Sequence, residues 1–182
     1  MKIALYSRII ISNMKDNFKQ ERVNLAAAFR WAARLNMHEA IANHFSLAVS
    51  DDGSQFLLNP IGMHFSQICA SDLLLIDSNN TETMSQPNAP DATAWAIHGA
   101  MHRNNLHARC ILHVHSKYAT ILSCLEDKTM KPIDQNTMRF YEKVSIDYNY
   151  DGMGLGDEAE RLCTVLGDNS VLLIKKYTHF MA

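Results

Sequence analysis

Two histidines separated by one residue carry the strongest chemical signal in the sequence. His113 and His115 lie in the segment 110–116, whose other residues are largely apolar. Because side chains alternate between the two faces of a β-strand, both imidazoles should project from one face, while Leu112 and Val114 project from the other. Two imidazoles on one face can bind a divalent metal such as zinc. The alternative is a pair of half-exposed histidines on an edge strand.

A catalytic zinc ion takes a third protein ligand and keeps one position open. His98 and His102 are four residues apart on an expected helix, so they could supply a further pair of ligands. The interpretation that we favour instead places His98 in the core and His102 on the surface. His44 and His64 are further candidates, which we expect in loops, and His179 is the fourth residue from the end of the chain.

The composition is that of a globular protein and excludes several classes. Of 182 residues, 47% are hydrophobic, and 17 basic against 19 acidic residues give a net charge of −2. Without a basic excess to contact phosphates, we expect no nucleic-acid partner. No run reaches the roughly 18 apolar residues of a membrane span, so we expect no membrane partner. The N-terminus lacks the pattern of a signal peptide. Cys69, Cys110 and Cys124 have apolar neighbours and no CxxC spacing, which predicts buried free thiols and a cytoplasmic location.

Hydrophobic periodicity predicts an α/β protein. Helices are expected over residues 18–37, 93–104, 118–125 and 157–166, and strands over 45–50, 55–58, 73–77, 108–115, 144–148 and 171–174. Residues 51–54 should close a hairpin, and the polar segment 78–91 should be a loop. Residues 1–17 are expected to form a peripheral leader, and residues 18–182 a single domain.

Several segments together resemble the class II aldolase/adducin family over residues 20–174. Residues 42–46 (ANHFS) stand where that family has a Gly-Asn-Ile-Ser turn, and residues 59–62 (NPIG) stand where it has Thr-Pro-Ser-Gly. Residues 71–77 are similar to its Glu-Asp-Leu strand, and residues 93–116 are similar to its helix and His-x-His strand. This combination is specific, whereas the histidine pair alone is not.

The resemblance implies a three-layer α/β/α sandwich with a central, largely antiparallel sheet, and homotetramers with active sites between subunits. Catalytic members hold Zn²⁺ with three histidines and cleave or form a carbon–carbon bond in sugar phosphates, because the metal stabilises an enediolate. His113 and His115 would be two of these metal ligands. The residues that would bind or neighbour a small-molecule substrate are Asn43, Asn59, Gly62 and Thr93.

Three departures from the family pattern weaken the enzyme interpretation. The position of the aldolase glutamate is Ala94, whose methyl group cannot transfer a proton, and the nearest carboxylate is Asp91. Tyr177 occupies the place of the third histidine in a gapless comparison, and His179 could replace it only after a backbone rearrangement. The sequence changes character after Ile174, which predicts a C-terminally truncated or frame-shifted product.

Two hypotheses follow from these observations. The first is a class II aldolase-like, metal-dependent carbon–carbon lyase (an aldehyde-lyase) that uses Zn²⁺ or another divalent ion on a small hydroxy-carbonyl or sugar-phosphate substrate. The second is a non-catalytic, adducin-like oligomeric interaction domain or an inactive truncated product. Ala42 and Ile61 replace a glycine and a serine of the phosphate loops, which favours a substrate without phosphate, or none. We expect a homo-oligomer.

Overall fold

The structure is a computed structural model that describes residues 17–150 and 152–175. Its elements are α2 (Lys19–Arg34), β1 (His44–Ala48), β2 (Gln55–Leu58), β3 (Leu74–Asp77), the 3₁₀ helix η1 (Thr81–Ser85), α3 (Ala92–Asn104), β4 (Cys110–His113), α4 (Lys117–Cys124), α5 (Gln135–Met138), β5 (Val144–Asp147), α6 (Asp157–Leu166) and β6 (Val171–Ile174). The predicted helices and strands are all present. Strand β4 is shorter than expected and ends at His113, and the short helices η1 and α5 were not predicted. Residues 1–16 of the expected leader lie outside the described residues.

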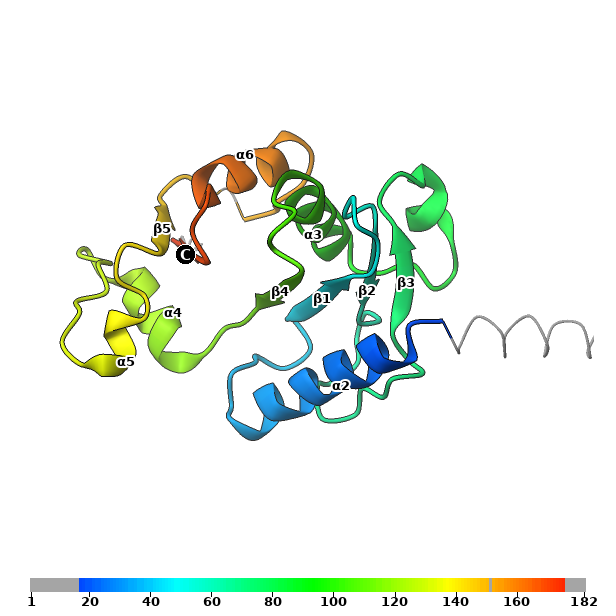
Figure 1. Cartoon of the computed structure of the whole chain (residues 1–182), viewed down its shortest axis with the longest axis horizontal. Coiled ribbons are helices and arrows are strands. Elements are labelled where there is room, and N and C mark those ends of the chain that lie inside the picture. The colour runs from blue at the N-terminus through cyan, green and yellow to red at the C-terminus, as the bar shows by residue number, and fades with distance from the viewer. Residues whose placement is uncertain (1–16, 151, 176–182) are drawn as a thin grey trace, which may run out of the picture.

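The centre of the molecule is a four-stranded antiparallel sheet in the order β3-β2-β1-β4 (Figure 1). Strands β1 and β2 form the predicted hairpin. Its turn contains Gly53 at φ 72°, where an added Cβ would lie 2.1 Å from the carbonyl oxygen of His102, so the turn packs directly against α3. Strand β4 pairs with the other side of β1 and places His113 opposite His44. Strands β5 and β6 form a separate parallel pair.

Helices cover both faces of this sheet (Figure 1). On one face, Phe29 of α2 stacks on Phe45 of β1 with their ring centroids 4.8 Å apart, in a cluster that includes Leu57 of β2. On the other face, Phe56 of β2 packs in a cluster with Ala94 of α3. Helix α6 packs beside α3 in the same layer. The predicted three-layer α/β/α sandwich with a largely antiparallel sheet is therefore confirmed.

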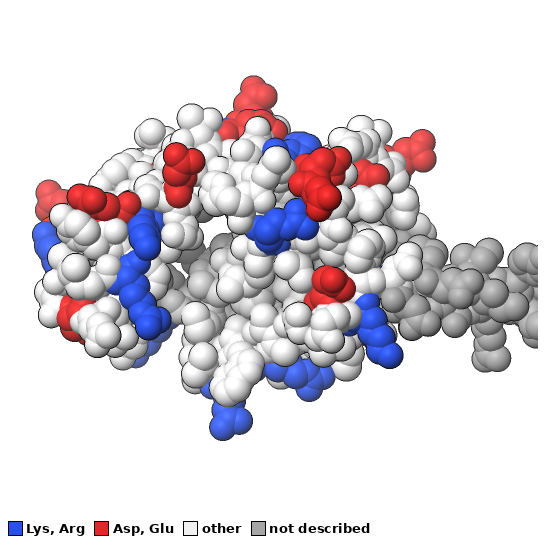
Figure 2. Space-filling view, in the orientation of Figure 1, with Lys and Arg blue, Asp and Glu red and all other residues white. Residues whose placement is uncertain are grey.

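Two further expectations concern the thiols and membrane-spanning segments. All four cysteines lie within the described residues and are free, but Cys69, Cys110 and Cys124 are exposed and only Cys163 is buried. The prediction of burial for the first three is wrong, because apolar neighbours in sequence do not ensure burial: Leu112 and Leu125, beside Cys110 and Cys124, are themselves exposed. Acidic and basic side chains are interspersed on the face shown in Figure 2. In the part of the chain that the structure describes, every helix is too short or too polar to cross a membrane.

Candidate functional site

Polar side chains from β1 and α3 meet in the layer between the sheet and α3. Phe45 packs toward α2, so alternation directs its neighbours His44 and Ser46 toward α3. His98 and His102 are one helical turn apart and lie on one face of α3. All four of these polar residues are at most 5% exposed. The register of β1 and the period of α3 thus bring three imidazoles and one hydroxyl into the interior.

A continuous series of hydrogen bonds joins these groups. At its inner end, His102 Nδ1 lies 2.9 Å from the carbonyl oxygen of Ala108, and His102 Nε2 lies 2.7 Å from Ser46 Oγ. Ser46 Oγ lies 2.5 Å from His98 Nδ1. His98 Nε2 in turn lies 2.6 Å from His44 Nδ1. The series therefore runs from the loop after α3 to the start of β1.

The same series continues to the histidine pair of the sequence motif. His44 Nε2 lies 3.0 Å from His113 Nδ1, across the pairing of β1 with β4. His113 Nε2 lies 3.0 Å from His115 Nε2, and His115 Nδ1 lies 2.5 Å from Glu39 Oε2. The two rings of the motif face one another, although β4 ends at the first of them. We define the histidine chain as the six residues His102, Ser46, His98, His44, His113 and His115.

Burial keeps the inner histidines neutral. Desolvation lowers the pKa of His44 to about 4, with a smaller contribution from the charge of His115. Desolvation likewise lowers the pKa of His102 to about 4, and it lowers that of His98 well below the usual 6.5. Near pH 7, each of these three rings therefore carries one proton, so it donates one hydrogen bond and accepts one.

The structure corrects two expectations about these histidines. His102 is buried rather than on the surface, and His44 begins β1 rather than lying in a loop. Both corrections have one cause: the histidine chain gives each ring nitrogen a partner, so burial does not leave an unsatisfied polar group. His98 lies in the core and His64 lies in a loop, as predicted. His179 lies outside the described residues.

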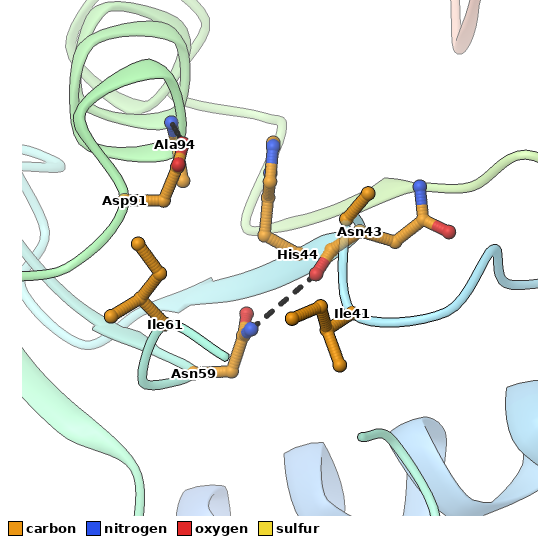
Figure 3. Close-up of a pocket in the computed structure, with 8 residues that line it drawn as sticks. Ile41, Asn43, His44, Asn59, Ile61, Asp91 and Ala94 are labelled. Atoms are coloured by element: carbon orange, nitrogen blue, oxygen red, sulfur yellow. Dashed lines mark hydrogen bonds between the residues drawn. The ribbon is translucent and has the colours of Figure 1, made fainter. Parts of the chain in front are cut away.

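A small cavity of about 40 Å³ opens beside the histidine chain at His44 (Figure 3). Such a volume holds a water molecule or a small polar group. His44 lines the cavity and is also the central link of the histidine chain, so the two features are contiguous. The cavity is lined by Ile41, Ala42, Asn43, His44, Asn59, Ile61, Asp91 and Ala94.

Two of the four predicted substrate-binding residues, Asn43 and Asn59, line this cavity. Asn59 Oδ1 accepts from the backbone N–H of Phe45 at 3.1 Å, and Asn59 Nδ2 donates to the carbonyl oxygen of Asn43 at 3.4 Å. The Asn43 side chain is turned away from Asn59 (Figure 3), and its Oδ1 accepts from the backbone N–H of Glu39 at 2.6 Å. Asn43 Nδ2 is buried without a hydrogen-bond partner among the described residues.

The cavity also contains the position where the resemblance places a catalytic glutamate. Ala94 occupies that position, and Asp91 is the carboxylate in the same wall (Figure 3). Asp91 Oδ1 accepts from the backbone N–H of Ala94 at 2.9 Å and caps α3. Gly62 and Thr93 do not line the cavity; Thr93 Oγ1 donates to the carbonyl oxygen of Met153 at 3.0 Å.

The sequence did not predict Glu39 and Ser46 as partners of the histidine motif. It offered His44 as a candidate ligand but predicted a loop position for it. Part of the signal was present, since His44 and Ser46 are two residues apart and His98 and His102 are four apart. The predicted strand began one residue too late, at position 45. The sequence also does not show that β4 pairs with β1, which is the contact that joins both histidine pairs.

The fit of this site to a metal ion can be judged from its donor atoms. Within residues 17–150 and 152–175, no group of three or more His, Cys, Asp or Glu side chains is arranged to hold a metal. The pair His113 and His115 supplies two imidazole nitrogens 3.0 Å apart, which are ligands of the type that zinc takes. Tyr177, at the expected third position, lies outside the described residues. The described residues therefore fit two positions of a metal's coordination shell.

Comparison with known proteins shows the family. The family described as Class II Aldolase and Adducin N-terminal domain matches residues 23–181. A protein of Pseudomonas aeruginosa that is named for the class 2 aldolases is 30% identical over 159 residues, which are 87% of this chain and 60% of the relative. A 4-hydroxy-3-prenylphenylpyruvate oxygenase/4-hydroxy-3-prenylbenzoate synthase of Streptomyces roseochromogenus is 26% identical over 168 residues, 89% of this chain and 60% of the relative. Adducins are also among the relatives.

A solved structure supports the same assignment. The aldolase II superfamily protein from Pseudomonas syringae superposes with a TM-score of 0.77 at 30% identity, over 88% of this chain and 64% of that protein. The chain spans about three fifths of the length of the curated relatives described above. The match over most of the chain and the shared sandwich lead to one conclusion: this protein belongs to the class II aldolase and adducin N-terminal domain family.

Proposed function

We propose that the chain is a class II aldolase-like, metal-dependent carbon–carbon lyase that acts on a small hydroxy-carbonyl substrate. The observation that carries this proposal is the approach of His113 Nε2 to His115 Nε2 at 3.0 Å. The Glu39 carboxylate accepts hydrogen bonds only, so His115 Nδ1 donates to it. In its neutral form, His115 then has its lone pair on Nε2, which faces Nε2 of His113. A proton or a metal ion can join these two nitrogens, and the pairing of a ligand histidine with a carboxylate is typical of metal sites.

Each residue of the site has a proposed role. His113 and His115 hold the divalent ion, for which zinc is the first candidate, and Glu39 orients the ring of His115. Once bound, the ion stabilises negative charge on adjacent oxygens of a hydroxy-carbonyl compound. Substrate binding is assigned to the loops around the cavity, with Asn43, Asn59, Gly62 and Thr93 as the proposed residues.

The class of substrate follows from the walls of the cavity. Ala42 and Ile61 line it where the resemblance leads us to expect a glycine and a serine hydroxyl. Neither side chain donates a hydrogen bond to an anion. Asn43 contributes to the wall of the cavity, but its amide is turned away from the other lining side chains (Figure 3). We therefore propose a hydroxy-carbonyl compound without phosphate over a sugar phosphate.

We also propose that the protein forms homo-oligomers in the cytoplasm. Within the described residues, β4 is the last strand of the sheet and pairs only with β1. Leu112 on this strand is 52% exposed. An uncovered edge strand with an exposed leucine invites pairing with another chain, and a second copy would cover it.

A non-catalytic, adducin-like interaction domain is the second candidate function. It is favoured by Ala94, which puts a methyl group where the resemblance predicts the proton-transferring glutamate. The presence of adducins among the relatives supports the same alternative. In this case the histidine chain would be retained as a buried polar network of the fold.

Metal content and carbon–carbon cleavage, measured on the same preparations, test the proposal. Wild type, His113→Ala and the control His64→Ala, whose ring contacts His38 outside the site, are compared. We expect about one bound divalent ion per chain in wild type and in the control, and its loss in His113→Ala. We also expect metal-dependent release of a carbonyl product from hydroxy-carbonyl compounds. Bound metal without cleavage would favour the adducin-like alternative, and absence of metal at micromolar supply with unchanged stability in EDTA would overturn the proposal.

A further inference from the structure

The inner end of the histidine chain determines the direction of its hydrogen bonds. The carbonyl oxygen of Ala108 can only accept, so His102 Nδ1 carries the ring proton and donates to it. Neutral His102 must then accept at Nε2 from the hydroxyl of Ser46. Because this bond uses the only proton of the hydroxyl, Ser46 Oγ accepts from His98 Nδ1. Each bond thus determines the direction of the next.

The same direction extends to the motif. Neutral His98 accepts at Nε2 from His44 Nδ1, and neutral His44 accepts at Nε2 from His113 Nδ1. His113 therefore carries its ring proton on Nδ1. Its lone pair is on Nε2, which is the atom that faces His115. The carbonyl group of Ala108, acting through the four side chains between it and His113, thereby determines that Nε2 of His113 is the nitrogen able to bind a metal.

This arrangement orients His113 and does not conduct protons away from it. A proton relayed inward from His113 would leave His102 as an imidazolium, and its burial opposes a positive charge there. The opposite direction of all bonds would place a lone pair of His102 Nδ1 against that carbonyl oxygen, so two buried acceptors would face one another. Only the outward-facing lone pair at His113 satisfies every buried group.

We propose that His44, His98, Ser46 and His102 are positioning residues that hold His113 in the Nδ1–H tautomer and so present its Nε2 to a divalent cation. The identity of that cation rests on the proposed function, but the tautomer is a property of the metal-free protein. Ser46 is the decisive link, because a hydroxyl can accept from one imidazole and donate to the next. Its side chain is fully buried, so solvent cannot replace it.

The first test measures the tautomer directly. Long-range ¹H–¹⁵N spectra of the metal-free protein distinguish protonated from unprotonated ring nitrogens, and the His113 signals are assigned with His113→Gln. We expect wild type to show a protonated Nδ1 and an unprotonated Nε2 at His113. Ser46→Ala should give a mixture of tautomers, and Ser46→Thr, which keeps the hydroxyl, should restore the single form. Ser123→Ala is the matched control, since it removes a buried hydroxyl that donates only within α4 to the carbonyl oxygen of Thr120.

The second test measures the affinity for Zn²⁺ alone by competition with a metal-binding dye. We expect Ser46→Ala to lose roughly 10- to 100-fold in affinity, while Ser46→Thr and Ser123→Ala stay near wild type. Wild type with the Nδ1–H tautomer but without zinc binding would overturn the proposed function and support the positioning role. An Nε2–H tautomer at His113 in wild type, or unchanged tautomers in Ser46→Ala, would overturn the positioning role. If Ser46→Ala does not fold, the tautomer of His113 in wild type alone tests the positioning role.

Discussion

Each imidazole of the histidine chain that lies in the interior has partners for both of its ring nitrogens. His98 is fully buried, and its two ring nitrogens form hydrogen bonds with His44 and with Ser46. In a medium of low dielectric constant such bonds are strong, and the loss of one partner leaves a costly unsatisfied group. Removal of one link should therefore destabilise the protein as well as alter the site.

The stability of the protein should fall in acid because of these rings. The folded-state pKa values of His44 and His102 are about 4, below the usual 6.5, so the unfolded chain binds protons first as the pH falls. We expect the free energy of unfolding to be constant above pH 6.5 and to decrease between pH 6.5 and 4, by roughly 1.4 kcal/mol per pH unit for each imidazole. Urea denaturation at a series of pH values measures this slope.

Substitution separates this effect from general acid sensitivity. His102→Gln should reduce the slope by about one proton, whereas His107→Gln, at an exposed position, should leave it unchanged. Equal slopes in wild type and His102→Gln would show that the buried ring does not titrate as its environment predicts.

Among the elements, an ion pair joins β5 to α6. Asp147 of β5 is 2% exposed, and both of its oxygens accept from Arg161 of α6 at 2.7 and 2.8 Å. These hydrogen bonds hold the pKa of Asp147 below its ordinary value. This ion pair joins the two-stranded β5-β6 sheet to the helical layer. A two-stranded sheet is only marginally stable without such a contact.

Asp147→Ala should therefore lower the free energy of unfolding by about 2 kcal/mol. This is less than the 3–5 kcal/mol of a fully buried pair, because the Arg161 side chain is 33% exposed to water. Lys131→Ala breaks an ion pair whose two side chains are more than half exposed, and it should leave stability unchanged. Thermal or urea denaturation of both variants tests this prediction. Equal losses of stability in the two variants would contradict it.

The elements also show what a sequence can predict. Helix α2 and the β1–β2 hairpin were predicted because their periodicity and turn residues are local signals. Helix α5 has four residues and no buried side chain, so it leaves no apolar period to detect. Of the histidine chain, only the pair His113 and His115 was favoured as a site from the sequence, and Asn43 and Asn59 of the neighbouring cavity were predicted from the family resemblance. The other links of the histidine chain depend on the pairing of β4 with β1, which is a long-range contact.

For the molecule as a whole, the exposed edge of the sheet predicts self-association. Leu112 on β4 is 52% exposed, and this strand has a neighbour on one side only within the described sheet. We expect wild type to run as a homo-oligomer in size-exclusion chromatography with light scattering, and Leu112→Lys to shift it toward the monomer. Ile133→Lys, at a position that is 83% exposed away from the sheet, is the control. A wild-type monomer with a sharp melting transition would contradict this expectation.

X-ray absorption at the zinc K-edge of the zinc-loaded protein counts the imidazoles bound to the metal. We expect scattering from two histidine rings with nitrogen at about 2.0 Å in wild type and in His64→Ala, and from one ring in His115→Ala. A spectrum without imidazole scattering, or one that His115→Ala leaves unchanged, would show that these two histidines do not hold the metal.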